Sequence, residues 1–141
     1  LPTLIKQKSG RVVFVSSVAG LLGTQYRATY SAAKAAIHMW ANSLRAEVAK
    51  DGIAVSVVFP GFVKTNVSFN ALNGEGKPQG HQDEAIENGL DVDVFAERVV
   101  ESLMAGDEYI VVGGKKEQLG VLVSRLSPSL LYKMIRKMKV K

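Results

Sequence analysis

The sequence predicts an α/β fold in which about three parallel strands form a sheet with helices packed against it. Two observations carry this prediction. Short apolar runs rich in β-branched residues occur three times, and segments with helical periodicity separate them. Alternation of this kind is typical of strand–helix–strand units, whose strands run parallel. The 141 residues are enough for about one ordinary domain.

The first two apolar runs are residues 11–16 (RVVFVS) and residues 53–59 (IAVSVVF). Their nearly continuous apolar character predicts strands that are buried on both faces of a parallel sheet. Ser9-Gly10 precedes the first run and Pro60-Gly61 follows the second, as glycine and proline commonly do at the ends of regular elements. A third, shorter strand is predicted at residues 109–112.

Helices are predicted before, between and after these strands. The helical segments are residues 1–8, 29–50 and 92–104, and the remainder after residue 112 with a break near Pro128. Asp51-Gly52 supplies the stop signal for the longest of them. Segment 92–104 has one apolar face, which predicts that it packs on the sheet. That face consists of Val92, Phe95, Val99 and Leu103.

Loops are predicted directly after the first two strands, at residues 18–25 and 62–90. The second of these is polar and glycine-rich. A connection of this length is uncommon unless it has a function, and such segments are often lids over a binding site. We therefore predict a lid at residues 62–90.

Composition excludes several classes of function. The net charge of +5 is concentrated at residues 128–141, which hold five cations and no acid. Without these five, 13 of the 18 basic residues remain and balance the 13 acidic residues. A neutral body argues against binding to nucleic acid. The absence of cysteine excludes thiolate chemistry, and two histidines are too few for a histidine-rich metal site. No signal peptide is visible, so we expect a cytoplasmic location.

The C-terminal tail has the pattern of a helix that lies on a membrane. Between Leu130 and Met138 the apolar residues fall on one helical face, beside clustered cations. The alternative is that the stripe docks on the protein's own core or on a partner subunit, and that the cations are only solvated. The apolar residues are Leu130, Leu131, Met134, Ile135 and Met138, and the cations are Lys133, Arg136, Lys137, Lys139 and Lys141.

Tyr30 and Lys34 are candidates for acid–base chemistry. On the predicted helix at residues 29–50 they are one turn apart and share a face. An ammonium group nearby lowers the pKa of a phenol, which brings it closer to the range in which it exchanges a proton with a substrate oxygen. Surface helices also carry such pairs by chance, so the pair alone leaves both interpretations open.

Other polar groups are predicted at the same place. Ser16 and Ser17 end the first strand, and residues 60–65 follow the second. Open parallel sheets bind ligands at the carboxyl ends of their strands. The helix that carries Tyr30 begins at that edge, so three local signals converge on one crevice.

Three stretches together resemble the short-chain dehydrogenase/reductase family: GRVVFVSSVAG, YSAAK and VFPGFVKT. The resemblance covers about residues 1–112. Ser17 lies 13 residues before Tyr30, the spacing of the family's serine, which selects it over Ser16. The stretch TNVSFNAL and the basic tail are further similar to the family's dehydrogenase/reductase member-seven branch.

The resemblance implies a fold that is the C-terminal half of a Rossmann-type doubly wound parallel sheet. It also implies an oxidoreductase that transfers hydride between a nicotinamide cofactor and a small carbonyl or alcohol substrate. The cofactor would be NADP or NAD, with NADP slightly preferred. Tyr30 would exchange the proton with the substrate oxygen. Lys34 would favour the phenolate and bind the nicotinamide ribose, and Ser17 would polarise the carbonyl. The residues that would hold the nicotinamide end are Pro60, Gly61, Val63 and Thr65.

The resemblance also implies organisation and partners. Residues 1–112 would be the catalytic half and residues 113–141 a helical extension, and the helix at residues 29–50 would pair two subunits in a homodimer. The family's glycine-rich loop, ribose selector and catalytic asparagine would all precede Leu1. The chain of 141 residues alone is therefore expected to be inactive. The alternative is a non-catalytic fragment that acts only as a pairing or structural unit.

Overall fold

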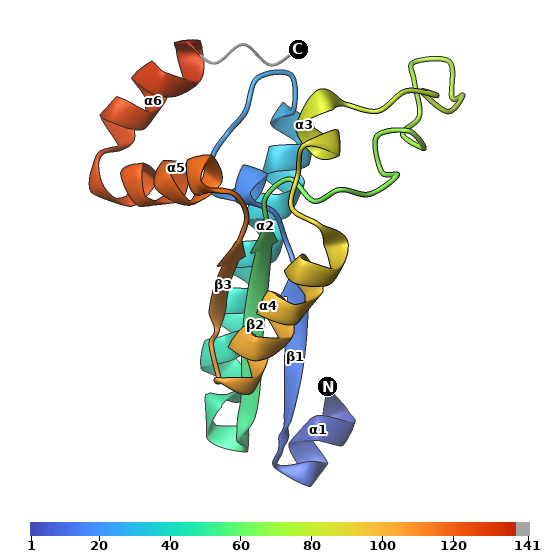
Figure 1. The fold of residues 1–141 in the computed structure, drawn as a ribbon. Coiled ribbons are helices and arrows are strands. Elements are labelled where there is room, and N and C mark those ends of the chain that lie inside the picture. Colours follow the sequence, from blue (N-terminus) through green and yellow to red (C-terminus); the bar gives the residue numbers. More distant parts are fainter. Residues whose placement is uncertain (138–141) are drawn as a thin grey trace.

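The computed structural model describes residues 1–137 and contains a parallel three-stranded sheet with helices on both faces (Figure 1). This confirms the predicted fold class. The strands lie in the order β1-β2-β3, so β2 is central. Their bounds are β1 Gly10–Val15, β2 Ile53–Pro60 and β3 Tyr109–Val112. In register, Val15 of β1 lies beside Val58 of β2, and Pro60 lies beside Val112 of β3.

Apart from the short helix α3, which lies in the segment 62–90 predicted as a loop, the helices follow the predicted order. Their bounds are α1 Pro2–Gln7, α2 Ala28–Val48, α3 Glu84–Glu87, α4 Val92–Met104, α5 Lys115–Leu126 and α6 Pro128–Lys137, with short 3₁₀ turns at Val18–Gly20 and Ala49–Asp51. The start of α4 is set by Asp91, whose side chain accepts hydrogen bonds from the backbone N–H groups of Asp93 (2.9 Å) and Val94 (3.4 Å). Such a cap satisfies donors that the first turn of a helix leaves free.

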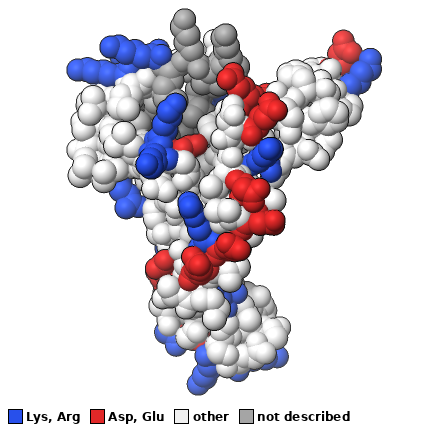
Figure 2. Space-filling model, in the orientation of Figure 1, with Lys and Arg blue, Asp and Glu red and all other residues white. Residues whose placement is uncertain are grey.

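Charged side chains are unevenly distributed over this fold. Figure 2 shows acidic residues gathered along α4 and the base of the 62–90 segment, and basic residues around α5 and α6. None of the helices in residues 1–137 combines the length and the apolar character that crossing a membrane requires.

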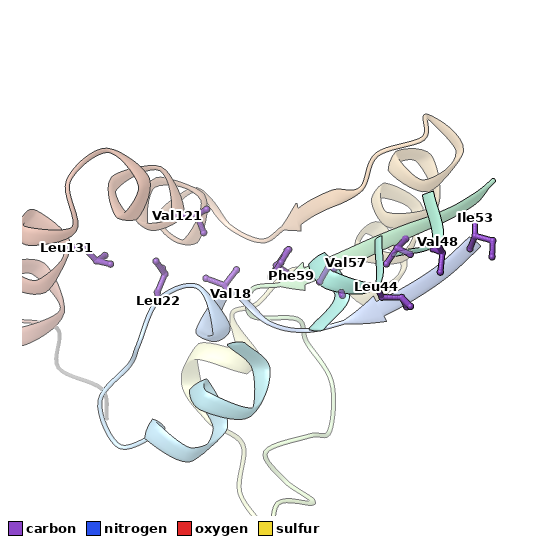
Figure 3. Packing of buried hydrophobic residues seen from close by; sticks show 11 residues of the cluster. Val18, Leu22, Leu44, Val48, Ile53, Val57, Phe59, Val121 and Leu131 are labelled. Atoms are coloured by element: carbon purple, nitrogen blue, oxygen red, sulfur yellow. The ribbon is translucent and has the colours of Figure 1, made fainter. Parts of the chain in front are cut away.

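The core lies between α2 and one face of the sheet. Ala41, Leu44 and Val48 of α2 are buried against the central strand, which contributes Val57 and Phe59 (Figure 3). On the opposite face, α4 covers a second cluster. Its buried members are Val58, Ile110 and Val112, and its partly buried members are Leu90, Phe95, Val99 and Leu103. β2 is thus buried on both faces, as its sequence predicts.

The same prediction is wrong for β1. Val12 and Phe14 pack against the core under α2, but Val13 and Val15 on the other face are 39% and 59% exposed. The cluster under α4 contains residues of β2 and β3 and none of β1. β1 is an edge strand, so within residues 1–137 one of its faces and one of its edges lie uncovered.

The apolar stripe of the tail is divided between two environments. Leu131 is buried in the main core and Ile135 packs against it, which agrees with the alternative that the stripe docks on the protein itself. Leu130 and Met134 remain exposed. Met138 lies outside the described residues.

His38 of α2 lies among aromatic rings in the main core. Its ring meets those of Phe59 and Tyr109 edge to face, with centroids 5.0 and 5.8 Å apart. Asn42 Nδ2 lies 3.1 Å from His38 Nε2. Burial, and then the positive charges of Arg45 and Arg125, lower the pKa of His38 below its ordinary value of 6.5. The neutral imidazole is therefore the form that suits the folded protein.

We predict that the protein loses stability as the pH falls below about 6.5 and that His38 contributes to this loss. The folded-state pKa is lowered, so the unfolded state binds more protons in this range and acid favours unfolding. The midpoint of urea unfolding should fall less between pH 7.5 and 5.5 in His38→Gln than in the wild type. His81→Gln, which changes an exposed histidine in the 62–90 segment, should keep the wild-type fall. Equal falls in all three proteins would contradict the prediction.

Candidate active site

The carboxyl ends of β1 and β2 bring two serines to one edge of the sheet. The Ser16 N–H donates to the Val58 carbonyl (2.8 Å) and continues the pairing of the strands. Ser17 then leaves the sheet. Its hydroxyl donates a long hydrogen bond to the Pro60 carbonyl (3.4 Å) and accepts one from the Ala19 N–H (3.1 Å). Ser17 therefore lies between the ends of the two strands.

The two serines have different surroundings. Ser16 is buried, and its hydroxyl donates to the Lys34 backbone carbonyl in α2 at 2.8 Å. This bond ties the end of β1 to the helix, and it uses the donor of Ser16. Ser17 is only partly buried, so it is the serine that can face a ligand at the edge of the sheet.

Tyr30 and Lys34 lie in the first turns of α2 at the same edge. Lys34 Nζ donates to the Val15 carbonyl at the end of β1 (3.2 Å) and lies 5.7 Å from the centroid of the Tyr30 ring. The ring is 44% exposed. The structure thus brings together a phenol, an ammonium group and the serine-bearing end of β1. Tyr26 is 92% exposed and has a left-handed backbone (φ 61°), so it lies outside this group.

Gly20 allows the turn after Ser17 to lie directly on α2. A Cβ atom at this position would be 2.8 Å from the Lys34 carbonyl carbon and 3.0 Å from the Ala35 nitrogen. These are backbone atoms of a helix and cannot easily move. From the sequence, Gly20 can be recognised only as a loop glycine, because the backbone atoms that it contacts belong to a different element, α2.

The turn at Pro60-Gly61 is packed as closely. The Gly61 N–H donates to the Val112 carbonyl at 2.8 Å, and a Cβ atom on Gly61 would be 3.0 Å from the Gly113 Cα. The turn predicted to hold the nicotinamide end therefore touches the segment that leads from β3 into α5. Gly113 was not predicted as part of the site. The Gly113-Gly114 pair directly after a strand is the signal that points to it.

The two ends of the 62–90 segment are joined at the base. The Leu90 N–H donates to the Phe62 carbonyl (2.9 Å), the Lys64 N–H donates to the Leu90 carbonyl (2.8 Å), and Val63 forms a parallel bridge with Leu90. A Cβ atom on Gly89 would be 2.8 Å from the Phe62 oxygen. Val63 is therefore held by the far end of its own loop.

Gln82 connects the interior of the same segment. Its Nε2 donates to the Thr65 carbonyl at 2.9 Å. Its Oε1 accepts from the Ser68 hydroxyl and from the Phe69 N–H, the latter at 3.2 Å. Thr65 is thus positioned by a residue distant in the chain. No local pattern in the sequence marks Gln82 for this role.

An ion pair links the segment to the entrance of α2. Arg27, the residue before α2, lies 3.3 Å from Asp83, which directly follows Gln82. Both side chains are partly exposed, so the pair adds about 1 kcal/mol at most. Its consequence is positional, because it holds the base of the segment close to the turn that carries Tyr30.

Within residues 1–137 there is no group of three or more His, Asp or Glu side chains that could hold a metal ion. The polar groups gathered at the edge are a hydroxyl, a phenol and an ammonium. Such a set can polarise a carbonyl and transfer a proton to its oxygen.

A family model described as short chain dehydrogenase matches residues 1–75. The chain is 39% identical over 141 residues to a dehydrogenase/reductase SDR family protein 7-like of Drosophila melanogaster, covering 100% of this chain and 43% of that protein. It is 35% identical over 135 residues to dehydrogenase/reductase SDR family member 7B of Xenopus laevis, covering 96% and 42%. The chain thus spans less than half the length of the curated relatives it matches.

Solved structures show the same fold. A short chain dehydrogenase from Burkholderia cenocepacia J2315 in complex with NADP aligns with a TM-score of 0.74 and 22% identity, over 95% of this chain and 50% of that one. A short chain dehydrogenase/reductase from Burkholderia phymatum in complex with NAD aligns with a TM-score of 0.72 and 20% identity, over 92% and 52%. At these identities the likeness establishes the arrangement of elements.

The contact at Gly20 predicts a local loss of stability. Gly20→Ala should destabilise the protein by about 1–3 kcal/mol, because the added methyl group must displace the backbone of α2 at Lys34. Gly23→Ala, three residues later, adds a methyl group with no neighbour within 4 Å and should change the free energy of unfolding by less than about 0.5 kcal/mol. Urea unfolding of both variants measures the difference. Equal effects would show that Gly20 is not closely packed.

Proposed function

Because the chain belongs to the short-chain dehydrogenase/reductase family, we propose that its edge site takes part in hydride transfer between a nicotinamide cofactor and a carbonyl or alcohol substrate. One observation supports this most strongly. Lys34 Nζ, held at the end of β1 by the Val15 carbonyl, lies 5.7 Å from the Tyr30 ring centroid, on the edge where Ser17 meets Pro60.

In the proposed mechanism the three side chains act on one substrate oxygen. The Ser17 hydroxyl donates a hydrogen bond to the carbonyl oxygen and polarises it. The Tyr30 hydroxyl gives its proton to that oxygen as the alkoxide forms, and takes the proton back in the oxidation direction. Lys34 stabilises the negative charge left on the phenolate. The nicotinamide cofactor supplies or accepts the hydride.

The described residues fit such a cofactor. An ammonium group can donate three hydrogen bonds, and among residues 1–137 Lys34 Nζ makes one, to Val15. Its other donors are free to bind the hydroxyls of the ribose. We propose that Pro60, Gly61, Val63 and Thr65 hold the nicotinamide end. The two Burkholderia proteins were crystallised with NADP and with NAD, which supports a cofactor of either form.

We further propose that residues 62–90 form a lid over the substrate and belong with residues 1–112 to the catalytic half, while residues 113–141 form a helical extension. The backbone hydrogen bonds that close the base of the segment at Leu90, and the hydrogen bond from the Gln82 side chain to the Thr65 carbonyl, support this division. They make the segment a folded loop anchored at the site, and between its base and its end the loop exposes Phe69 and Leu72. Exposed apolar side chains of this kind suit contact with a small organic substrate.

The catalytic role of Tyr30 is tested in the full-length protein. Tyr30→Phe removes the transferable proton and keeps the ring, so kcat should fall on the order of 10² or more, with a smaller change in KM. Tyr26→Phe makes the same chemical change on an exposed ring and should leave kcat unchanged. Steady-state kinetics with every carbonyl substrate that the wild type accepts gives the comparison.

Retention of full kcat in Tyr30→Phe would refute the acid–base role. An inactive wild-type protein that still assembles with other subunits would favour the alternative function, a non-catalytic pairing unit.

We also propose that the protein forms a homodimer through α2, the helix through which this family commonly pairs. The outer face of α2 exposes Met39 and Trp40 beside several alanines, and the Trp40 ring is held edge to face on Phe14 at 5.1 Å. A rigid aromatic ring surrounded by small residues allows close approach of a symmetry-related helix.

We predict that Met39→Glu converts the dimer of the full-length protein to a monomer, because it places two like charges in a desolvated contact. Met104→Glu makes the same change at an exposed position on α4 and should leave the dimer intact. Light scattering at tens of micromolar reports the mass. A monomeric wild type, or a dimeric Met39→Glu variant, would rule out α2 as the interface.

A further inference from the structure

Helices α5 and α6 expose a continuous apolar edge. Leu119, Leu122 and Leu126 lie on one face of α5 and are all more than half exposed, with Leu126 at 76%. Leu130 and Met134 continue the exposed apolar surface on α6. Leu126 and Leu130 flank the corner at Ser127, so the two stripes meet there. In Figure 1 this corner projects away from the sheet and from the lid.

The opposite faces of α5 and α6 are buried against the rest of the protein. Gly120 and Val121 of α5 and Leu131 of α6 are buried, and Leu22 packs so closely that a Cβ atom on Gly120 would be 2.9 Å from it. The inner faces therefore fix the orientation of the pair. The exposed leucines are not simply misplaced core residues, because the core face of each helix is filled.

Positive charge surrounds this edge. Within residues 113–137 the only acid is Glu117. The cations are Lys115, Lys116, Lys133, Arg136 and Lys137, together with Arg125, whose guanidinium lies over the Tyr109 ring, 4.3 Å from its centroid. Figure 2 shows blue side chains around the white surface of α5 and α6, whereas most of the acidic side chains in that view lie over α4 and the base of the lid. An apolar edge bordered almost entirely by cations is complementary to a surface that is both apolar and negatively charged.

We propose that the α5–α6 edge docks on an anionic membrane surface, a function separate from hydride transfer. The exposed leucines and Met134 enter the boundary between headgroups and acyl chains, and the cations bind lipid phosphates and carboxylates. A second copy of the chain is a poorer occupant, because it would bring the same cations against themselves.

The experiment compares vesicles and variants of the full-length protein. Wild-type protein should co-sediment with phosphatidylcholine vesicles that contain phosphatidylserine, bind pure phosphatidylcholine at least about tenfold more weakly, and be released by salt. The double variant Leu126→Ser/Leu130→Ser should lower the affinity for anionic vesicles at least about tenfold. Its matched control, Val100→Ser/Met104→Ser, removes two exposed apolar side chains from α4 and should bind as the wild type does.

The contribution of the cations is tested in the same way, with charge-reversal variants and a matched control. Lys133→Glu/Lys137→Glu should lower the affinity at least about tenfold, whereas Lys6→Glu/Lys50→Glu, with the same change in net charge at distant exposed positions, should have a much smaller effect. The absence of binding, equal binding to both lipids, or equal binding by the α5–α6 variants and their controls would overturn the proposal. So would a fall in Tm caused by the α5–α6 serine variant without vesicles, because another part of the protein would then cover the edge.

Discussion

The contact between the turn Val18–Gly20 and helix α2 determines where every candidate catalytic group lies. Ser16 donates its hydroxyl hydrogen bond to the Lys34 carbonyl, and Gly20 lets the turn rest on the same residue's backbone. The Lys34 side chain then returns to the Val15 carbonyl. Three independent contacts thus join the end of β1 to one turn of α2. They fix the ammonium group relative to Ser17, and the i, i+4 spacing of the helix fixes Tyr30 relative to the ammonium group.

This arrangement depends in turn on the central strand. β2 is buried on both faces, and α2 packs on it through Ala41, Leu44 and Val48. Because parallel strands all end at one edge, the same packing brings Pro60 beside Ser17 and Gly61 beside Gly113. The serine, the phenol and the ammonium group are therefore carried by the end of a strand and the first turns of a helix, which hold a reacting geometry more precisely than loops do.

Sequence patterns within one segment predicted the elements whose structure depends mainly on residues of that same segment. Segment 92–104 was placed correctly, because an Asp cap and a 3.6-residue apolar period both act within one helix. Tyr30 and Lys34 lie one turn apart on α2, with Lys34 Nζ 5.7 Å from the centroid of the Tyr30 ring, because their spacing also acts within one helix. Burial of β1 on both faces was wrong, because an apolar strand does not reveal whether a neighbour covers it. The tail could not be predicted in full for a similar reason. Periodicity placed Leu130 and Leu131 on one apolar stripe, but only Leu131 joins the core cluster that contains Val121 and Leu22, and Leu130 stays exposed. The role of Gln82 depends on a loop closing over 17 residues of sequence, and nothing local encodes it.

The two segments outside the sheet leave its carboxyl edge on different sides. The 62–90 segment, the proposed lid, departs from β2 and α5 departs from β3, and they extend in opposite directions in Figure 1. Their origins touch, because Gly61 before the lid packs on Gly113 before α5 at backbone distance, and a Cβ atom on Gly61 would also be 3.2 Å from the Glu117 side chain. The small residues at this junction thus connect the proposed docking edge with the proposed cofactor turn.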